Sequence, residues 1–236
     1  MNEPIGGKTK NESKGKKTAL VTGAAGALGS ALVEQLMQAG WDCIALDRNR
    51  RGLEQFHDRL SAAGAAPLVV PLDLAGAGPQ HFDQLAGSLQ DQFDRLDALV
   101  HAAAEFKALT PLEHHPADDW MKTLQAGLTG PFLLSQALLP LMRATEGSRM
   151  VWVADDPAAR SKAYWGAYGV AQSGRSALAS ILAAECRRDG PEVVEIDPGP
   201  FYSPLRSKAW PVENPDDLPT AADAAKKVMA VVSGGR

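Results

Sequence analysis

Short apolar runs alternate with segments of helical periodicity along most of this 236-residue chain. The apolar runs predict β-strands at about 18–22, 42–47, 67–71, 97–102, 149–154 and 192–196. Regular alternation of strands and helices is typical of parallel strands joined by right-handed crossovers, with helices covering both faces of the sheet. The pattern therefore predicts an α/β fold with a single domain over residues 18–236.

Residues 1–17 differ from the rest of the chain. They contain five lysines among Gly, Asn, Ser and Thr, and few side chains that a core would bury. We expect a disordered, solvated tail there, with an arm that binds a partner or nucleic acid as the alternative.

Composition narrows the classes of function. A 45% hydrophobic content is enough for a sizeable core, and a net charge of -4 gives no general attraction to nucleic acid or to an anionic membrane. No apolar run is long enough to cross a bilayer, and the N-terminus lacks the apolar core of a signal peptide. We therefore expect a cytoplasmic protein in which Cys43 and Cys186 remain reduced thiols.

The stretch Thr18–Gly29 contains the strongest candidate binding site. Gly23, Gly26 and Gly29 follow the first predicted strand at three-residue spacing, and a helical pattern begins just after them. Unpaired N–H groups at such a helix N-terminus attract an anion, and the absence of side chains lets a pyrophosphate come close. An ordinary strand–loop–helix connection is the alternative.

Two charged residues at the end of the second predicted strand bear on the choice of nucleotide. Asp47 lies 18 residues beyond Gly29, where a carboxylate accepts hydrogen bonds from an adenosine ribose and repels a 2′-phosphate. Arg48 follows directly and would neutralise such a phosphate, so NAD is predicted with NADP as the second choice. Asp73, after the third strand, could contact the adenine amino group. The alternative for Asp47 is a helix cap or turn residue.

Several motifs extend this dinucleotide pattern over the chain. They are Thr22–Gly29, Asp73–Leu74, Leu99–Ala104, a long helix starting at Asp118, Trp165–Tyr168 and Asp197–Pro204. In this order and spacing the chain resembles the short-chain dehydrogenase/reductase family over nearly all of residues 18–233. The resemblance implies a Rossmann-type doubly wound parallel sheet of order 3-2-1-4-5-6, without the usual seventh strand, that binds NAD(P) at the carboxyl edge of its strands.

The resemblance also implies which residues contact the cofactor. They are Gly23, Gly26, Leu28, Gly29, Asp47, Arg48, Asp73, Leu74, Ala102, Ala103, Gln172, Pro198, Gly199 and Ser203. Two motifs depart from the family pattern. The middle glycine comes one place early, with Ala27 in its usual position, and His101–Ala104 stands where Asn-Asn-Ala-Gly is common. We interpret His101 as a polar residue satisfied at a strand end.

The catalytic residues that the resemblance implies are mostly replaced. In the family a Tyr transfers the proton, a Lys four residues later lowers its pKa, a Ser binds the substrate oxygen and an Asn supports a relay water. Tyr168 occupies the tyrosine position, but the other positions hold Gln172, Asp155 and Gly127. Lowering a tyrosine pKa from about 10 to about 7 takes roughly 4 kcal/mol, which a neutral amide cannot supply. An ionised Asp155 would repel a phenolate, whereas a protonated one would donate to a carbonyl oxygen.

The sequence leaves three possible functions open. The chain is an oxidoreductase of weak or altered activity, a catalytically silent dinucleotide-binding sensor or partner subunit, or a relic that binds no cofactor. The small-molecule substrate is not identified, and no nucleic-acid or membrane partner is expected. The resemblance implies a homodimer or homotetramer formed through the long helices at about 117–143 and 164–188.

Overall fold

The computed structural model describes residues 15–235, except for the side chain of residue 159. Residues 1–14 of the expected tail lie outside the described residues. The strands are β1 (Thr18–Thr22), β2 (Asp42–Asp47), β3 (Leu68–Pro71), β4 (Ala98–His101), β5 (Arg149–Val153) and β6 (Glu192–Ile196). The α-helices are α1 (Ala27–Gln38), α2 (Arg50–Ala62), α3 (Pro79–Gln92), α4 (Ala117–Leu124), α5 (Gly130–Arg143), α6 (Pro157–Arg160), α7 (Gly166–Glu185), α8 (Pro204–Ala209) and α9 (Ala221–Val232). Shorter helical segments are η1 (Leu112–His114), η2 (Gln125–Thr129) and η3 (Pro215–Asp217).

The described strands form one parallel sheet in the order β3-β2-β1-β4-β5-β6. In the register of its centre, Leu20 of β1 pairs with Ile44 of β2 and with Leu99 of β4. Strand order reverses on either side of β1, because β2 lies on one side and β4 on the other. The fold and strand order expected from the resemblance are confirmed, and no seventh strand occurs within residues 15–235.

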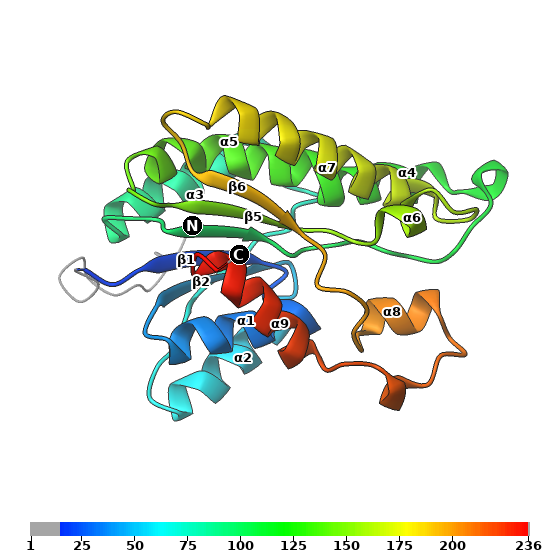
Figure 1. Cartoon of the computed structure of the whole chain (residues 1–236), viewed down its shortest axis with the longest axis horizontal. Helices are drawn as coiled ribbons and strands as arrows, with labels where there is room; N and C mark the ends of the chain where they lie inside the picture. The colour runs from blue at the N-terminus through cyan, green and yellow to red at the C-terminus, as the bar shows by residue number, and fades with distance from the viewer. Residues whose placement is uncertain (1–14, 236) are drawn as a thin grey trace.

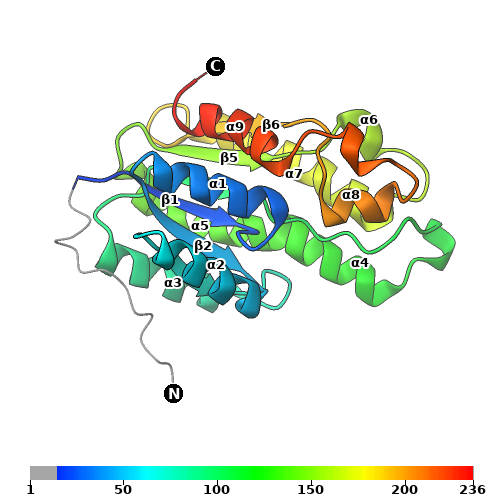
Figure 2. The same cartoon turned by 90° about the horizontal axis from the view of Figure 1, so that it is seen from below.

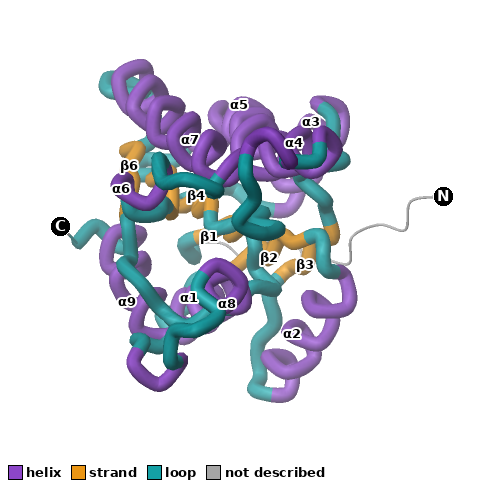
Figure 3. The backbone as a smooth tube through the Cα atoms, turned by 90° about the vertical axis from the view of Figure 1, so that its right-hand side faces the viewer, coloured by secondary structure: helices purple, strands orange, loops and turns teal. Residues whose placement is uncertain are grey.

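The molecule has three layers, as a parallel sheet requires when both of its faces are apolar. Helices α3, α5 and α7 cover one face of the sheet, and α1, α2 and α9 cover the other (Figure 1). The view turned by 90° shows α1 and α2 lying across β1 and β2 (Figure 2). Seen end-on, the sheet separates the two helical layers, and α8 lies in front of α1, on the side of the sheet that α1, α2 and α9 cover (Figure 3).

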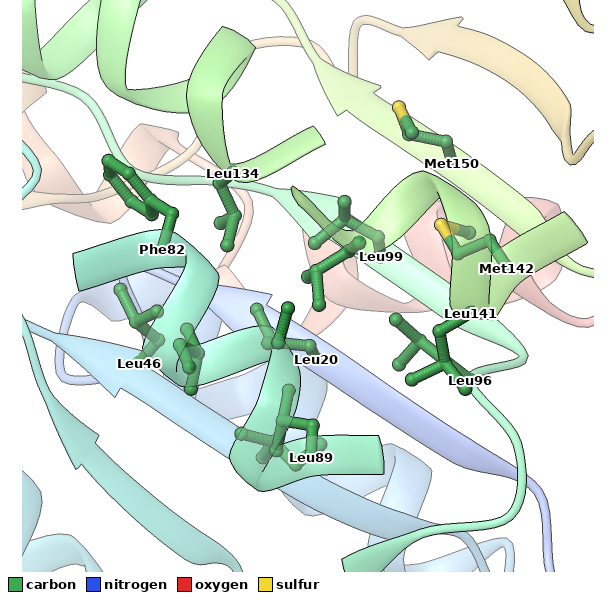
Figure 4. Packing of buried hydrophobic residues seen from close by; sticks show 14 of the residues in the cluster. Leu20, Leu46, Phe82, Leu89, Leu96, Leu99, Leu134, Leu141, Met142 and Met150 are labelled. Atoms are coloured by element: carbon green, nitrogen blue, oxygen red, sulfur yellow. The ribbon is translucent and has the colours of Figure 1, made fainter. Parts of the chain in front are cut away.

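Side chains of different size line the two faces. Leu20, Ile44 and Leu99 point toward α3 and α5, where they meet Leu89 and Leu134 in the cluster of Figure 4. Their neighbours along the strands, which point toward α1 and α9, are mostly small; these are Ala19, Val21, Cys43, Ala45, Ala98 and Val100. The small side chains let α1 approach the sheet closely, which brings its N-terminus to the end of β1.

The long helix expected at about 117–143 is interrupted. Its central residues form the π-helical segment η2, between α4 and α5. Gly127 lies within this segment, and a Cβ added there would lie 3.0 Å from Cβ of Ala171 in α7. The glycine therefore allows η2 and α7 to pack closely, and the extra turn residue re-aims the chain at that point.

Two other expectations can be compared with the structure. Cys43 and Cys186 are both buried, and no disulfide joins them in the described part of the chain. Among residues 15–235 no helix combines the length and apolar character needed to cross a membrane.

Candidate functional site

A cavity of about 890 Å³ opens at the carboxyl edge of the strands. That volume is typical of pockets that take a cofactor or small molecule. Every residue expected to contact the cofactor or to act in catalysis lines it; these are Gly23, Gly26, Leu28, Gly29, Asp47, Arg48, Asp73, Leu74, Ala102, Ala103, Asp155, Tyr168, Gln172, Pro198, Gly199 and Ser203. The cavity lies where strand order reverses, which is where ligands bind in open α/β sheets.

The glycine-rich turn joins β1 to α1 through closely packed backbone. Gly23 has a φ of 71°, and a Cβ there would lie 2.9 Å from Cα of Ala103. A Cβ on Gly29 would lie far inside van der Waals contact of the Gly23 carbonyl group. The helix begins at Ala27, its N-cap residue Gly26 has no side chain to cap it, and no acidic residue lies in its first turn. The positive end of the α1 dipole therefore lies at the cavity with no side chain of its own first turn capping it.

Acidic and basic side chains surround the end of β2. Asp47 accepts the N–H of Ala25 at Oδ2 (3.0 Å) and the N–H of Asn49 at Oδ1 (2.8 Å), so its carboxylate holds the glycine-rich turn against β2. The side chain of Arg48 is about half exposed, and its Nη1 lies 2.6 Å from Oε2 of Glu105. Glu105 is a cavity residue that sequence reasoning missed, because nothing in the pattern shows that the loop after β4 turns back toward β2.

Tyr168 and Asp155 meet on the opposite side of the cavity. The Tyr168 hydroxyl donates to Oδ2 of Asp155 at 3.0 Å, and Tyr168 is only 7% exposed. Burial raises the pKa of Tyr168 well above its ordinary value of 10, and the charge and hydrogen bond of Asp155 raise it further. The positive charge of Arg175 and a hydrogen bond from Gln172 oppose that rise in the pKa but do not cancel it.

Gln172 and Arg175 follow Tyr168 along one face of α7, at spacings of four and seven residues. Arg175 donates to the carbonyl oxygens of Ala103 (3.0 Å) and His101 (2.7 Å). Its side chain is buried, and burial lowers its pKa to about 10, so it remains charged at neutral pH. Within the described residues, Oε1 of Gln172 and Nε of Arg175 are buried without a hydrogen-bond partner.

Comparison with known proteins now decides the family. The profile of the short chain dehydrogenase family matches residues 17–214. D-threitol dehydrogenase of Mycolicibacterium smegmatis is 32% identical over 213 residues, which are 90% of this chain and 78% of that protein. The uncharacterised oxidoreductase YciK of Escherichia coli is 29% identical over 205 residues, covering 86% of this chain and 81% of the relative. The chain belongs to the short-chain dehydrogenase family.

Solved structures of short chain dehydrogenases agree with this family assignment. A short chain dehydrogenase of Shigella flexneri, crystallised with NADP, superposes with a TM-score of 0.87 at 27% identity and covers 92% of this chain and 90% of its own. A short chain dehydrogenase of Escherichia coli CFT073, solved with NADPH, gives the same TM-score, identity and coverage. The match over nearly the whole chain fits the six-stranded sheet described above.

Arg175 is the second cavity residue that sequence reasoning missed in this short-chain dehydrogenase. The expected position for a cation near the tyrosine was residue 172, and Gln172 stands there. The helical spacing 168, 172 and 175 carries the signal that could have found it, because all three positions share one face of α7. The structure therefore corrects the picture of a tyrosine with only uncharged or negative neighbours.

His101 lies beneath the cavity and takes no part in it. It is fully buried, its ring stacks on Trp152 with centroids 4.1 Å apart, and its Nε2 lies 2.8 Å from Oγ of Ser135. Because that hydroxyl donates to the carbonyl oxygen of Pro131, it accepts from Nε2 of His101. Burial and the charge of Arg175 hold the pKa of His101 well below its ordinary value, so the ring is neutral.

A cluster of aromatic side chains packs against Tyr168. Its ring lies 5.5 Å from the rings of Phe106 and Trp165, and Trp165 in turn lies 5.1 Å from Trp210. Trp210 lines the cavity, and Arg206 lies over its ring at 4.3 Å. The side of the cavity that faces the Tyr168 hydroxyl is thus partly apolar.

Proposed function

We propose that this short-chain dehydrogenase binds a nicotinamide dinucleotide, preferring NAD(H), and interconverts a carbonyl compound and an alcohol with altered proton handling. The observation that carries the proposal is the single cavity that gathers the glycine-rich turn, Asp47, Gln172 and Tyr168. The neighbours solved with NADP and NADPH support a dinucleotide as the ligand class.

The residues present fit such a cofactor at both ends. Backbone N–H groups at the uncapped start of α1 suit a pyrophosphate. Asp47 retains acceptor capacity for ribose hydroxyls, since each of its oxygens accepts only one backbone N–H. Oε1 of Gln172, buried without a partner in the described residues, suits a hydroxyl donor such as the second ribose. The bound nicotinamide would supply or accept the hydride.

Proton transfer would then fall to Tyr168. In reduction, the neutral phenol of Tyr168 would donate its proton to the carbonyl oxygen, and a proton from solvent would restore the phenol, whose hydroxyl Asp155 orients by accepting its hydrogen bond. Burial first, and then the negative charge and the hydrogen bond of Asp155, disfavour the phenolate, and these are the causes of the raised pKa of Tyr168. The arrangement therefore favours reduction over oxidation and favours low pH over high pH.

The raised pKa of Tyr168 also favours a second function, a dinucleotide-binding sensor or partner subunit without turnover. Two kinds of measurement, of nucleotide binding and of turnover, separate the enzyme from the silent protein. Calorimetric titration with NADH and NADPH tests binding, and both functions fail if neither binds. Turnover of NADH with a panel of ketones, aldehydes and quinones supports the enzyme, and binding without turnover supports the silent protein.

The double variant Gln172→Lys with Asp155→Ser tests whether these two replacements limit activity. We expect it to raise turnover at least tenfold, because about 1.4 kcal/mol of added phenolate stabilisation is enough for that change. Gln90→Lys with Asp91→Ser makes the same chemical changes on the exposed side of α3 and is the matched control. An unchanged rate in a folded double variant would show that the replaced positions are not the limit.

Exposed apolar side chains and the lining of the cavity bear on two further points, the assembly of the protein and the class of its substrate. Exposed apolar side chains on α4, α5 and α7, namely Met121, Phe132, Val170 and Ile181, support a homodimer or homotetramer through these helices. Light scattering of the purified chain tests it. Leu205 and Trp210 line the cavity and pack against the cluster of Phe106 and Trp165; they favour a substrate with an apolar group next to its carbonyl, which the same NADH assay panel tests.

A further inference from the structure

Glu105 is a buried carboxylate that the proposed reaction does not use. Its side chain is 7% exposed, and both of its oxygens meet cations. Oε2 lies 2.6 Å from Nη1 of Arg48, and Oε1 lies 3.2 Å from Nζ of Lys107. Burial of a carboxylate is costly unless it is paired, so this geometry ties Arg48 to Glu105 more firmly than a surface ion pair would.

The ion pair spans the cavity. Arg48 follows β2, and Glu105 follows β4, while β1 lies between these two strands. Both residues line the cavity together with Gly23 at the end of β1. The Arg48–Glu105 pair therefore lies in the same cavity as the glycine-rich turn, and Arg48 directly follows Asp47 in the chain.

Arg48 is the side chain that a 2′-phosphate on the adenosine ribose would need. Glu105 engages the Nη1 donor of Arg48, so Arg48 must give up that contact before it can offer Nη1 to the phosphate, and among the described residues the buried carboxylate then keeps Lys107 as its one cation. If Arg48 stays, the phosphate meets the negative charges of Asp47 and Glu105. A ribose without the phosphate makes neither demand, because its hydroxyls donate to Asp47.

We infer that Glu105 is a specificity-determining residue, which selects NAD(H) against NADP(H) by holding Arg48 away from the 2′-phosphate. The inference rests on the proposed function, since it assumes that the cavity binds a nicotinamide dinucleotide. It differs from the part played by Asp47, because Glu105 acts through a second side chain and from a different strand.

The test is the ratio of the dissociation constants of NADPH and NADH, measured by calorimetry on the full chain. In Glu105→Gln we expect this ratio to fall roughly tenfold, because Arg48 gains a charge-assisted contact with the phosphate and one negative charge is gone. Glu54→Gln removes the same charge from the exposed pair Arg50–Glu54 on α2, which does not line the cavity, and should leave the ratio unchanged.

Two Arg48 variants keep the test decisive. Arg48→Met added to Glu105→Gln should cancel the gain. Arg48→Met alone, at a side chain that is 53% exposed, should change the ratio by less than about threefold, since Arg48 is already committed to Glu105. This single variant also decides the matter if Glu105→Gln does not fold.

The outcomes separate the inference from the proposed function. If neither nucleotide binds the unmodified chain, the proposed function fails and the inference fails with it. If both bind but Glu105→Gln leaves the ratio unchanged, or Arg48→Met alone raises it tenfold, then only the role of Glu105 is refuted.

Discussion

The two halves of the cavity differ in how their polar groups are partnered. Around the glycine-rich turn, Asp47 accepts two backbone N–H groups, and Arg48 and Glu105 pair with each other. Around Tyr168, the described residues leave Oε1 of Gln172 and Nε of Arg175 buried without partners. The first half is therefore a preformed scaffold, whereas the second presents polar atoms that a bound molecule can satisfy.

The departures from the family pattern differ between the halves in the same way. In the nucleotide half, backbone packing constrains Gly23 and Gly29, and these two glycines keep their family positions although the middle glycine is shifted by one place. The positions around Tyr168 hold charged and amide side chains whose partners are incomplete or opposed in sign. Binding geometry and proton chemistry are thus separable properties of one cavity.

The largest effect is expected in the scaffold half, for Gly29→Ala. The added methyl group would overlap the Gly23 carbonyl, so the turn must shift, and the free energy of unfolding should fall by about 3 kcal/mol. Urea denaturation measures it. Gly87→Ala is the control, because a Cβ there meets nothing within 4 Å; in a helix interior the change should stabilise by about 0.5–1 kcal/mol. Equal effects of the two variants would contradict a tightly packed turn.

A smaller effect concerns His101, which lies below the half of the cavity around Tyr168. Because its pKa is lowered in the folded protein, the unfolded chain binds a proton below pH about 6.5 that the folded protein excludes. Stability is therefore lost as the pH falls, by about 2 kcal/mol from this residue between pH 7 and pH 5. His101→Asn should remove that part of the loss in urea titrations at the two pH values. His114→Asn, at a side chain 73% exposed, is the control and should leave the loss unaltered.

The substitution Asp155→Asn tests how the charge of Asp155 affects the pKa of Tyr168. Loss of the charge should lower the pKa of Tyr168 by about one unit or more, while burial still keeps it above 10. Ultraviolet titration of tyrosinate reports the change, and the same variant carrying Tyr168→Phe isolates the signal. Asp156→Asn changes the adjacent carboxylate, which accepts from Ala158 and not from Tyr168. If both substitutions lower the pKa equally, the specific pair at 3.0 Å is not its cause.

The smallest effect on stability is expected for Gln172→Met. Its Oε1 has no partner in the described residues and its hydrogen bond to Tyr168 is a single neutral one, so the free energy of unfolding should fall by no more than about 1 kcal/mol. Affinity for NADH should nevertheless fall roughly tenfold by calorimetry, because a ribose hydroxyl loses its acceptor. Gln35→Met, which removes a hydrogen bond to Ala222 between α1 and α9, should do the reverse and cost stability without affinity.

The sequence by itself determined the α/β fold and one end of the cavity. Apolar runs in alternation with helical patterns imply a parallel sheet, and local motifs such as Gly23–Gly29 act within a few residues of each other. The carboxyl ends of parallel strands meet at one edge, so Asp47 and Asp73 were brought to the cavity by topology alone. Tyr168 and its replaced neighbours Gln172 and Asp155 were found through family resemblance.

Only the tertiary structure decided the charge pairs. Arg48 meets Glu105 across β1, 57 positions further along the chain, and Arg175 reaches the carbonyl oxygens that follow β4. No local pattern encodes such contacts, because a long flexible side chain has many partners within reach until the packed elements remove all but a few. The raised pKa of Tyr168 was likewise decided by the tertiary structure, because burial, the largest cause of that rise, exists only once the chain has folded.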